Sequence, residues 1–334
     1  MTSVLVTGGA GYIGSHTTLQ LVAAGHNVVV LDNLYSGHRW AVSKDADFYQ
    51  GDIADAEIIG NIIMQHDIQA VVHFAGHIVV PESVEDPLKY YRNNVAGSLN
   101  LIQSCVDNGV NQFVFSSSAA VYGMPDSIPV AENAEKRPIN PYGLTKLITE
   151  WTLSDLAAAA PEFRYVALRY FNVAGAHIGG SLGQATPEAT HLIKVACQSA
   201  SGQRSAMSIF GDDYDTVDGT CVRDYIHVDD LARAHLDALK YLSGGGASVA
   251  LNCGYGNGYS VHEVIDMVKK VSGVNFVTNQ EGRRPGDPAE LVADNHLIRE
   301  LFGWKPKYAD LETICRSAYE WELKLLESGN FKQS

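Results

Sequence analysis

A glycine-rich turn near the N-terminus constrains the fold of this chain more than any other feature. The sequence GGAGYIG (8–14) satisfies G-x-G-x-x-G through Gly9, Gly11 and Gly14; it follows the apolar run VLVTGG and opens a helical stretch. In a strand–turn–helix unit, glycines let the backbone approach a pyrophosphate, whose charge is stabilised by the helix N-terminus. The turn therefore predicts a dinucleotide-binding unit.

An acidic residue after the next apolar run indicates which dinucleotide binds. Asp32 follows the turn and ends the run NVVVL, where a ribose-binding acid is expected about 20 residues on. A carboxylate accepts hydrogen bonds from ribose hydroxyls but repels a 2′-phosphate, and the neighbouring Asn33 is neutral, so we predict NAD and not NADP. Asp52 is a candidate partner of the adenine amino group, with a helix N-cap as the alternative.

Short apolar runs recur along the first half of the chain, with room for a helix between them. They are VLVTGG, NVVVLDN, ADFYQGD, AVVHFAG, QFVFSSS and YVALRYFNV. This alternation predicts an α/β fold with a Rossmann-type, doubly wound parallel sheet that is covered by helices on both faces. The later run SVALNCGYG is expected to return to the same sheet.

The composition changes after about residue 175, where AHIGGSLGQATPEATHL predicts a loop. We expect residues 1–175 to form the NAD-binding domain, with returning segments near 221–255. Residues 176–334 are expected to form a smaller C-terminal lobe that binds substrate. A chain of 334 residues is long enough for two cores.

Charge and cysteine content exclude several classes of function. The net charge of −14 argues against a nucleic-acid partner, because phosphate binding requires a basic field. The apolar runs fall short of the roughly 18 residues that suggest a membrane span, and a secretory signal is not recognisable. Five dispersed cysteines without a CxxC pair indicate reduced thiols, hence a cytoplasmic protein, and give no metal site.

A tyrosine and a lysine four residues apart suggest acid–base chemistry. NPYGLTK places Tyr142 and Lys146 on one face of a helix. A phenol has an ordinary pKa near 10, but an ammonium one turn away and a nicotinium charge would both favour the phenolate. Tyr142 is therefore a candidate general base. Taken alone, most Y-x-x-x-K pairs are only an exposed helix face.

The stretch FVFSSSAAVYG (113–123) ends a predicted strand in three hydroxyls followed by two alanines. The pattern fits either a plain loop or a site where a hydroxyl such as that of Ser118 takes part and a carboxylate is absent. We expect Ser116 and Ser117 to satisfy backbone groups at the strand end.

Together these motifs resemble the extended short-chain dehydrogenase/reductase family, and within it the group of UDP-glucose (UDP-galactose) 4-epimerases. The resemblance covers nearly the whole chain and also rests on FAG (74–76), NN (93–94), LRYFNVAGAH (168–177), IFGDDYDTVDGTCVRDYIHVDDLA (209–232) and GRRPGDPA (282–289). It implies reversible 4-epimerisation of UDP-glucose and UDP-galactose through a transient 4-keto sugar. Tightly bound NAD would oxidise and re-reduce C4.

The resemblance further implies roles for individual residues. Ser118, Tyr142 and Lys146 would be catalytic. Cofactor-binding residues would include Tyr142 and Lys146 together with Gly8, Gly11, Tyr12, Ile13, Gly14, Asp32, Asn33, Asp52, Ile53, Phe74, Ala75, Gly76, Asn93 and Phe171. The UDP-hexose would contact Ser118 and Tyr142 as well as Asn172, Leu192, Phe210, Arg223, Arg284, Asp287 and Leu291.

Some of these assignments have alternatives. Arg223 could simply pair with Asp224, and Arg284 could be a solvated loop residue. His191 stands where other members have an amide, and either a structural or a ligand-binding histidine fits. Ile78 replaces a lysine that some members carry near the nicotinamide.

Leu291 bears on substrate choice. The resemblance places it beside the 2-substituent of the sugar, where a large residue goes with plain hexoses and a small one leaves room for an N-acetyl group. Leucine is intermediate, which predicts UDP-glucose and UDP-galactose as the main pair, with some turnover of UDP-GlcNAc and UDP-GalNAc.

Two related activities are separated by other residues. A 4,6-dehydratase of this family has an acidic pair where this chain has Ala119 and Ala120, and methyl groups cannot transfer protons. A 4-epimerase of UDP-glucuronate or UDP-xylose stays as the alternative function. A homodimer is expected from the family, through helices near 89–108 and 142–160.

Overall fold

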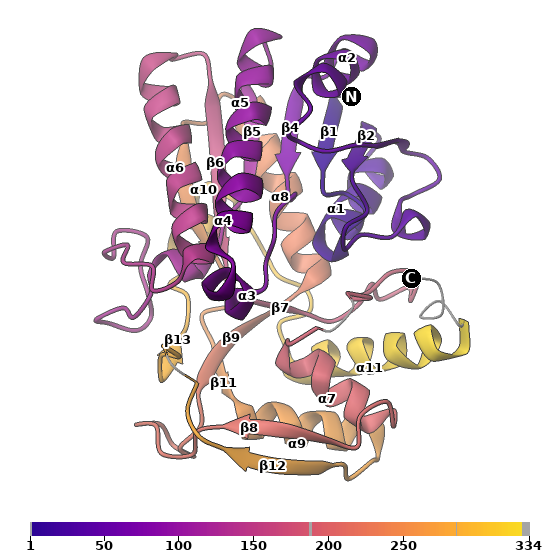
Figure 1. Ribbon diagram of the computed structural model, residues 1–334, viewed down its shortest axis with the longest axis vertical. Helices are drawn as coiled ribbons and strands as arrows, with labels where there is room; N and C mark the ends of the chain where they lie inside the picture. The colour runs from indigo at the N-terminus through magenta and orange to yellow at the C-terminus, as the bar shows by residue number, and fades with distance from the viewer. Residues whose placement is uncertain (1, 187–188, 285, 329–334) are drawn as a thin grey trace.

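The centre of the computed structural model, which describes residues 2–186, 189–284 and 286–328, is a seven-stranded sheet (Figure 1). All neighbouring strands in it are parallel, in the order β10-β6-β5-β4-β1-β2-β3. The strands are β1 (Ser3–Thr7), β2 (Asn27–Asp32), β3 (Asp47–Gln50), β4 (Ala70–His73), β5 (Gln112–Ser116), β6 (Arg164–Tyr170) and β10 (Val249–Cys253). The predicted parallel sheet is confirmed, including the late strand that returns to its edge.

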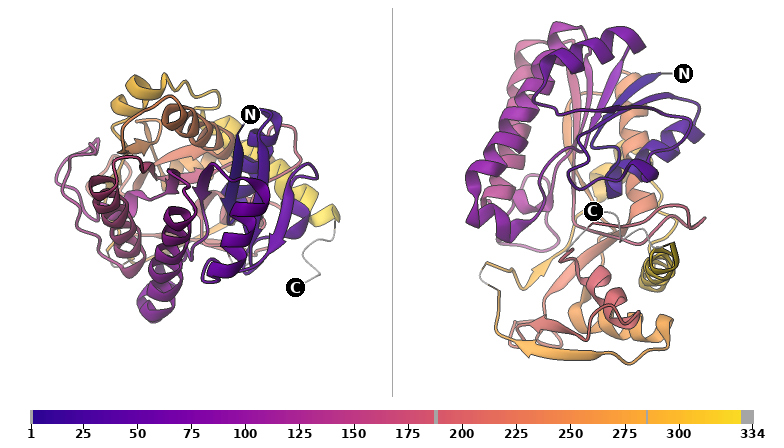
Figure 2. Two further views of the ribbon diagram at one scale, coloured as in Figure 1. Left: turned by 90° about the horizontal axis from the view of Figure 1, so that it is seen from above. Right: turned by 45° about the vertical axis from the view of Figure 1, so that its right-hand side comes forward.

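Successive residues of each strand feed two separate cores, as the two-residue period of a strand requires. On β1, Val4 and Val6 pack on one face of the sheet, whereas Leu5 packs on the other. The first face is covered by α1 (Tyr12–Ala23) and α8 (Val228–Ser243). The second is covered by α2 (Ala56–His66), α5 (Ser98–Asp107) and α6 (Pro141–Ala159) (Figure 2). Because both faces are buried, the strands read as continuous apolar runs.

A smaller group of elements lies beyond the carboxyl ends of these strands (Figure 1). Three short strands pair with β9 (Val222–His227) in a four-stranded sheet: β7 (Asn172–Ala174), β11 (Gly258–Ser260) and β13 (Glu290–Leu291). Next to it, β8 (Ala206–Phe210) pairs with β12 (Val277–Glu281). Three helices pack together beside them, α7 (Leu192–Ala200), α9 (Val261–Ser272) and α11 (Leu311–Ser328), and α10 (His296–Phe302) contacts α8 and β10.

One predicted strand is divided in two. The run YVALRYFNV forms β6 up to Tyr170 and then β7 from Asn172, so Phe171 lies at the crossing from the large sheet to the small one. This crossing carries the chain from the carboxyl edge of the large sheet into the smaller group of elements.

A second special segment leads into α5. The helical stretch begins with α3 (Val80–Glu85) and α4 (Pro87–Tyr90) and then widens into a π-helix over Tyr91–Gly97 before α5 continues it. Short π-helical turns within α-helices occur often at functional sites. Two single 3-10 turns, Arg39–Ala41 and Ala119–Val121, complete the described elements.

None of the described helices has both the length and the apolar character needed to cross a membrane.

Candidate active site

The glycine-rich turn packs directly against the chain that follows β4. Gly8 has φ +73°, and a Cβ built on it would lie 2.6 Å from the backbone nitrogen of Ala75. A Cβ on Gly14 would lie 2.2 Å from the carbonyl oxygen of Gly8. Contacts this short require glycine at both positions. The predicted cofactor segments 8–14 and 74–76 are therefore neighbours at the carboxyl edge of the sheet.

Gly11 fits a role toward a ligand. A Cβ on Gly11 would approach only the Gly8 carbonyl oxygen, at 3.3 Å, so the described protein itself leaves this side open. Gly11 is also the N-cap of α1, and among the described residues no side chain caps that helix. The uncapped N–H groups at Tyr12 and Ile13 can therefore receive a pyrophosphate. The residues present fit a dinucleotide.

Asp32 is the last residue of β2 and is buried beside this turn. Its two carboxylate oxygens accept backbone N–H groups, one from Ala10 at 2.9 Å and one from Leu34 at 2.8 Å. Burial raises the pKa of Asp32, although both hydrogen bonds act in the opposite direction. Each oxygen still has a further lone pair, so the carboxylate can also accept from ribose hydroxyls.

Asn33 and Asp52 contact each other. The Nδ2 of Asn33 donates to one oxygen of Asp52 at 2.8 Å, and the backbone N–H of Ala54 donates to the other at 2.9 Å. The N-cap of α2 is Asp55, so the alternative assignment of Asp52 as a helix cap is wrong. Ile53 is buried against Gly97 of the π-helix.

The π-helix holds the segment after β4. Asn94 accepts from the backbone N–H of His77 at 2.8 Å and donates to the carbonyl of the same residue at 2.9 Å. Asn93 donates to the Asn94 side chain at 2.8 Å, so it helps to hold the amide that binds His77. Phe74, at the other end of the segment, packs on His235 with the ring centroids 4.6 Å apart.

The predicted catalytic residues come together at the same edge of the sheet. Tyr142 and Lys146 lie in the first turns of α6, and both are buried. The hydroxyls of Tyr142 and Ser118 share a hydrogen bond. Lys146 Nζ donates to the Ser116 carbonyl at 2.8 Å and lies 6.0 Å from the centroid of the Tyr142 ring. Nζ also lies 3.7 Å from the Cβ position of Gly76, so the catalytic and cofactor segments meet here.

The electrostatics of these groups differ from the expectation. Burial raises the pKa of Tyr142, and the hydrogen bond with Ser118 opposes this. Burial lowers the pKa of Lys146 to about 8, which the nearby Glu150 counteracts. The predicted lowering of the Tyr142 pKa is therefore not produced by this chain alone, because the effect of desolvation exceeds that of the hydrogen bond with Ser118.

The two other serines of the FVFSSSAAVYG stretch (113–123) have side-chain partners. Ser116 pairs with the Tyr170 hydroxyl, and Ser117 donates to Glu150 at 2.5 Å. The expectation that they satisfy backbone groups is wrong. Glu150 also forms a buried ion pair with Arg169, at 2.6 Å. Ser117 therefore belongs to a buried polar network beside the site.

Two predicted substrate residues line one pocket, which lies between β7, α7 and α11. Asn172, at the start of β7, and Leu192, at the start of α7, both line it. His191 precedes Leu192 and is the N-cap residue of α7, but its side chain makes no capping hydrogen bond. Phe171 lies next to Asn172 and, like Leu291, packs against a buried apolar cluster that includes Ala119.

The remaining predicted substrate residues form two pairs. Arg223 on β9 pairs with Asp287 at 3.1 Å. Asp224, the alternative partner of Arg223, accepts instead from the backbone N–H groups of Tyr255 and Gly256, at 2.9 Å each. The Cζ of Arg284 lies over the Phe210 ring, 3.8 Å from its centroid. Arg284 is nevertheless exposed, as expected if it is a solvated loop residue. Pro285 in the same motif lies outside the described residues.

Comparison with known proteins agrees with this geometry. A model of the NAD-dependent epimerase/dehydratase family matches residues 4–254. A UDP-glucose 4-epimerase of Azospirillum brasilense is 55% identical over 325 residues, which are 97% of this chain and 93% of that protein. The chain belongs to the NAD-dependent epimerase/dehydratase family.

Two solved members of the family have the same fold. The UDP-glucose 4-epimerase from Brucella ovis, in complex with NAD, has a TM-score of 0.93 and 46% identity, covering 96% of this chain and 98% of that one. The UDP-Glc/GlcNAc 4-epimerase from Campylobacter jejuni has a TM-score of 0.86 and 49% identity, covering 97% and 100%. The predicted Rossmann-type fold and NAD dependence are confirmed by these matches.

Some residues of the site in this family member were not singled out from the sequence. Asn94 hydrogen-bonds to the segment after β4, whereas the predicted Asn93 hydrogen-bonds to Asn94. The sequence does not indicate which of two adjacent asparagines faces the site when an α-helix widens locally into a π-helix. Gln184 and Lys194, which hold the chain before α7, were also missed. A polar lysine in the helical run HLIKVACQ was the only available signal.

Proposed function

We propose that this chain catalyses the reversible 4-epimerisation of UDP-glucose and UDP-galactose through a 4-keto sugar. The observation that carries the proposal is the meeting of Ser118, Tyr142 and Lys146 with the glycine-rich turn at one edge of the sheet. Relatives named UDP-glucose 4-epimerase match nearly the full length of the chain. A UDP-glucuronate or UDP-xylose epimerase is not favoured by these relatives.

Tyr142 transfers the proton, and Ser118 orients the oxygen that carries it. The Tyr142 phenolate takes the proton of the sugar 4-hydroxyl and becomes the phenol, and the phenol returns this proton to the same oxygen after the sugar has turned over. Ser118 shares a hydrogen bond with Tyr142 and can also contact the sugar O4, so it orients the oxygen between them. Ala119 and Ala120, which follow Ser118, cannot act on other positions of the sugar.

Lys146 links the catalytic residues to the cofactor segment. Its anchoring to the Ser116 carbonyl fixes the ammonium between the strand end and Gly76, where it can bind the nicotinamide ribose. When bound, NAD supplies the hydride acceptor and donor for C4 and a positive charge that favours the Tyr142 phenolate. The raised pKa of Tyr142 in the chain alone fits a site that becomes basic only when it is loaded.

The remaining predicted residues are assigned to the two ligands. Gly11, Tyr12, Ile13 and Asp32 would hold the pyrophosphate and ribose of NAD. Arg223, with its planar fork, suits the pyrophosphate of the UDP-sugar, and Asp287 suits the uridine ribose. Their mutual ion pair at 3.1 Å would then be exchanged in part for ligand contacts.

Leu291 bears on the choice of sugar. Like Phe171, it packs against the buried cluster that contains Ala119, so it borders the segment after Ser118 from the side of β13. We infer that its intermediate size leaves UDP-glucose and UDP-galactose as the main pair and permits some turnover of the N-acetylated sugars. The similarity to the Campylobacter jejuni UDP-Glc/GlcNAc 4-epimerase supports this.

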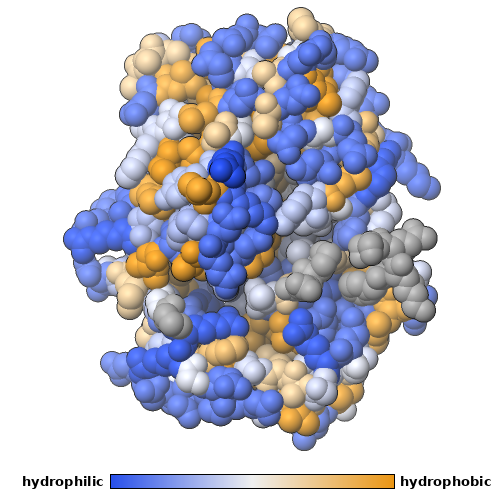
Figure 3. Space-filling view, in the orientation of Figure 1, coloured by the Kyte–Doolittle hydropathy of each residue, from blue (hydrophilic) through white to orange (hydrophobic). Residues whose placement is uncertain are grey.

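We also propose a homodimer in a reducing compartment such as the cytoplasm. Leu99, Val106 and Trp151 are exposed apolar side chains on α5 and α6, which pack side by side. On the face in Figure 3, apolar residues recur over these helices. All five cysteines are buried and unpaired, which suits a compartment that keeps thiols reduced.

Product analysis tests the reaction. The purified chain is incubated with UDP-galactose without added NAD, and UDP-glucose is separated by chromatography. Formation of UDP-glucose is expected, because NAD would be carried by the protein. Tyr142→Phe is the matched variant: it should keep NAD but lose turnover by roughly 10²–10⁴-fold. Unchanged turnover in Tyr142→Phe would refute the assigned mechanism.

A further inference from the structure

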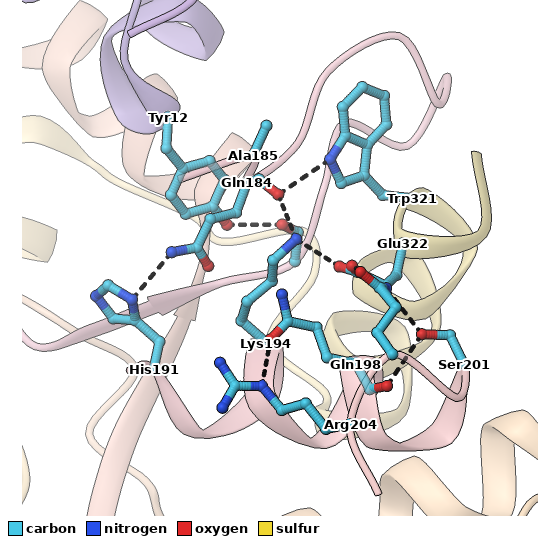
Figure 4. Close-up of polar contacts among 12 residues, drawn as sticks. Tyr12, Gln184, Ala185, His191, Lys194, Gln198, Ser201, Arg204, Trp321 and Glu322 are labelled. Atoms are coloured by element: carbon cyan, nitrogen blue, oxygen red, sulfur yellow. Dashed lines mark hydrogen bonds and ion pairs between the residues drawn. The ribbon is translucent and has the colours of Figure 1, made fainter. Parts of the chain in front are cut away.

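Gln184 lies where the chain between β7 and α7 meets α11 (Figure 4). Its carbonyl oxygen accepts two hydrogen bonds, from Lys194 Nζ at 2.8 Å and from Trp321 Nε1 at 3.2 Å. One donor comes from α7 and the other from α11. The backbone at Gln184 is therefore held from both helices.

The lysine that holds Gln184 is part of a buried ion pair. Lys194 Nζ lies 2.5 Å from Glu322 Oε2, and both side chains are almost fully buried. The other oxygen of Glu322 accepts from Gln203 at 2.6 Å. Removing two charges from water costs several kcal/mol per ion unless the geometry compensates. Both ions have further partners here, since the ammonium also donates to the Gln184 carbonyl and the carboxylate also accepts from Gln203.

The side chain of Gln184 acts on His191. Gln184 Nε2 lies 2.9 Å from His191 Nδ1 (Figure 4). An amide nitrogen only donates, so Nδ1 accepts and the proton of the neutral ring is on Nε2. Burial lowers the pKa of His191, which keeps the ring neutral. The ring therefore has an Nε2–H donor that Gln184 does not use.

This histidine borders the pocket assigned to the nucleotide sugar. His191 lines it together with Asn172, Leu192 and Gln184 itself. We propose that Gln184 is a positioning residue for the nucleotide sugar: it fixes the His191 tautomer so that a neutral ring offers Nε2–H to a polar oxygen of the ligand. Lys194, Glu322 and Trp321 fix Gln184 in turn. The inference rests on the proposed function, because it assumes that a UDP-sugar enters this pocket.

Gln184→Leu tests the inference, since it preserves the side-chain volume and the backbone carbonyl but removes the donor to His191. We expect the Kd for UDP-glucose, measured by calorimetry on the NAD-loaded protein, and the KM to rise roughly tenfold, which corresponds to about 1.4 kcal/mol. The kcat should stay within about twofold, and the bound NAD, measured after acid release, should be unchanged.

Two further variants separate positioning from folding. Trp321→Phe removes one of the two donors to the Gln184 carbonyl and keeps an aromatic ring, so a smaller rise in Kd is expected even if Gln184→Leu does not fold. Gln203→Ala is the matched control, because it removes a hydrogen bond from Glu322 on the side away from Gln184 and should leave the Kd unchanged.

The histidine tautomer gives a readout that a merely structural role would not move. In ¹⁵N-histidine NMR spectra, assigned with His191→Asn, His191 should carry its proton on Nε2 in the parent chain and lose this preference in Gln184→Leu. A wild-type Kd in Gln184→Leu and Trp321→Phe, or a proton on Nδ1 in the parent, overturns the inference. Failure of the parent to form UDP-glucose would instead refute the proposed reaction while leaving the UDP-glucose Kd test intact.

Discussion

At the scale of single residues, Tyr142 occupies surroundings that oppose its proposed use as a base. Its ring is buried, and burial raises its pKa, because a phenolate loses the solvation of water. Among the influences on the phenol within this chain, the hydrogen bond from Ser118 is the one that lowers the pKa. Ser118 therefore has an electrostatic role in addition to contacting the sugar.

Ser118→Ala should change the pH dependence of turnover. Without the hydroxyl, the pKa of Tyr142 rises further, so the phenolate forms only at higher pH. The acid limb of kcat/KM should therefore move to higher pH, and kcat at neutral pH should fall by about 10²-fold. Initial rates of UDP-galactose conversion across a pH series measure both effects.

Ser117→Ala is the matched control for this prediction. Its hydroxyl is the neighbour of Ser118 in sequence but donates to Glu150, so the acid limb should stay where it is in the parent chain. An acid limb that moves equally in both variants, or in neither, would contradict the role assigned to Ser118.

At the scale of helices and strands, the large sheet was predictable because its strands are buried on both faces. Continuous apolar runs such as NVVVLD then mark each strand without help from distant residues. The division of YVALRYFNV was not predictable, since Phe171 is as apolar as its neighbours and the crossing depends on pairing of β7 with β9.

The candidate site shows the same limit. The glycine turn, Asp32 and the Tyr142–Lys146 spacing are local patterns, and each lies at the predicted place. The Arg223–Asp287 pair joins residues 64 positions apart, and the partners of Ser117 depend on how α6 packs on β5. Contacts between distant segments are not encoded in any local period, so the sequence left them open.

Asp224 lies on β9, in the four-stranded sheet, and gives a stability prediction. Burial raises its pKa to about 6, so it is ionised at pH 8, where one oxygen accepts from Tyr255 and the other from Gly256 and Ala293. In Asp224→Asn the amide nitrogen would face N–H donors. We expect the free energy of unfolding to fall by about 1–3 kcal/mol, the cost of an unsatisfied buried group.

Urea denaturation at pH 8 measures this effect. Asp310→Asn is the control, because Asp310 is exposed and accepts one N–H, from Thr313 at 2.8 Å, which an amide oxygen can also accept. Equal stabilities of Asp224→Asn and Asp310→Asn would show that the acceptors on Asp224 do not stabilise the protein.

At the scale of the whole molecule, the outer face of α5 and α6 differs from an ordinary solvated surface. Trp151 on α6 is 54% exposed, and Leu99 on α5 is 43% exposed. Apolar residues that gather on one surface mark interaction sites more often than scattered ones do. The two helices run side by side along one side of the molecule (Figure 2), so a second copy could pack its own pair against them as a four-helix bundle.

Trp151→Glu should therefore convert the proposed dimer into a monomer, because an interface would have to bury an unpaired carboxylate, which is costly. Light scattering after size exclusion measures the mass, and turnover of the monomer shows whether each copy carries a complete site. Val277→Glu is the control: Val277 is 58% exposed on β12, which pairs with β8 outside the large sheet, and its substitution should leave a dimer. A dimer that persists in Trp151→Glu, or a parent chain that is already monomeric, would exclude this face as the interface.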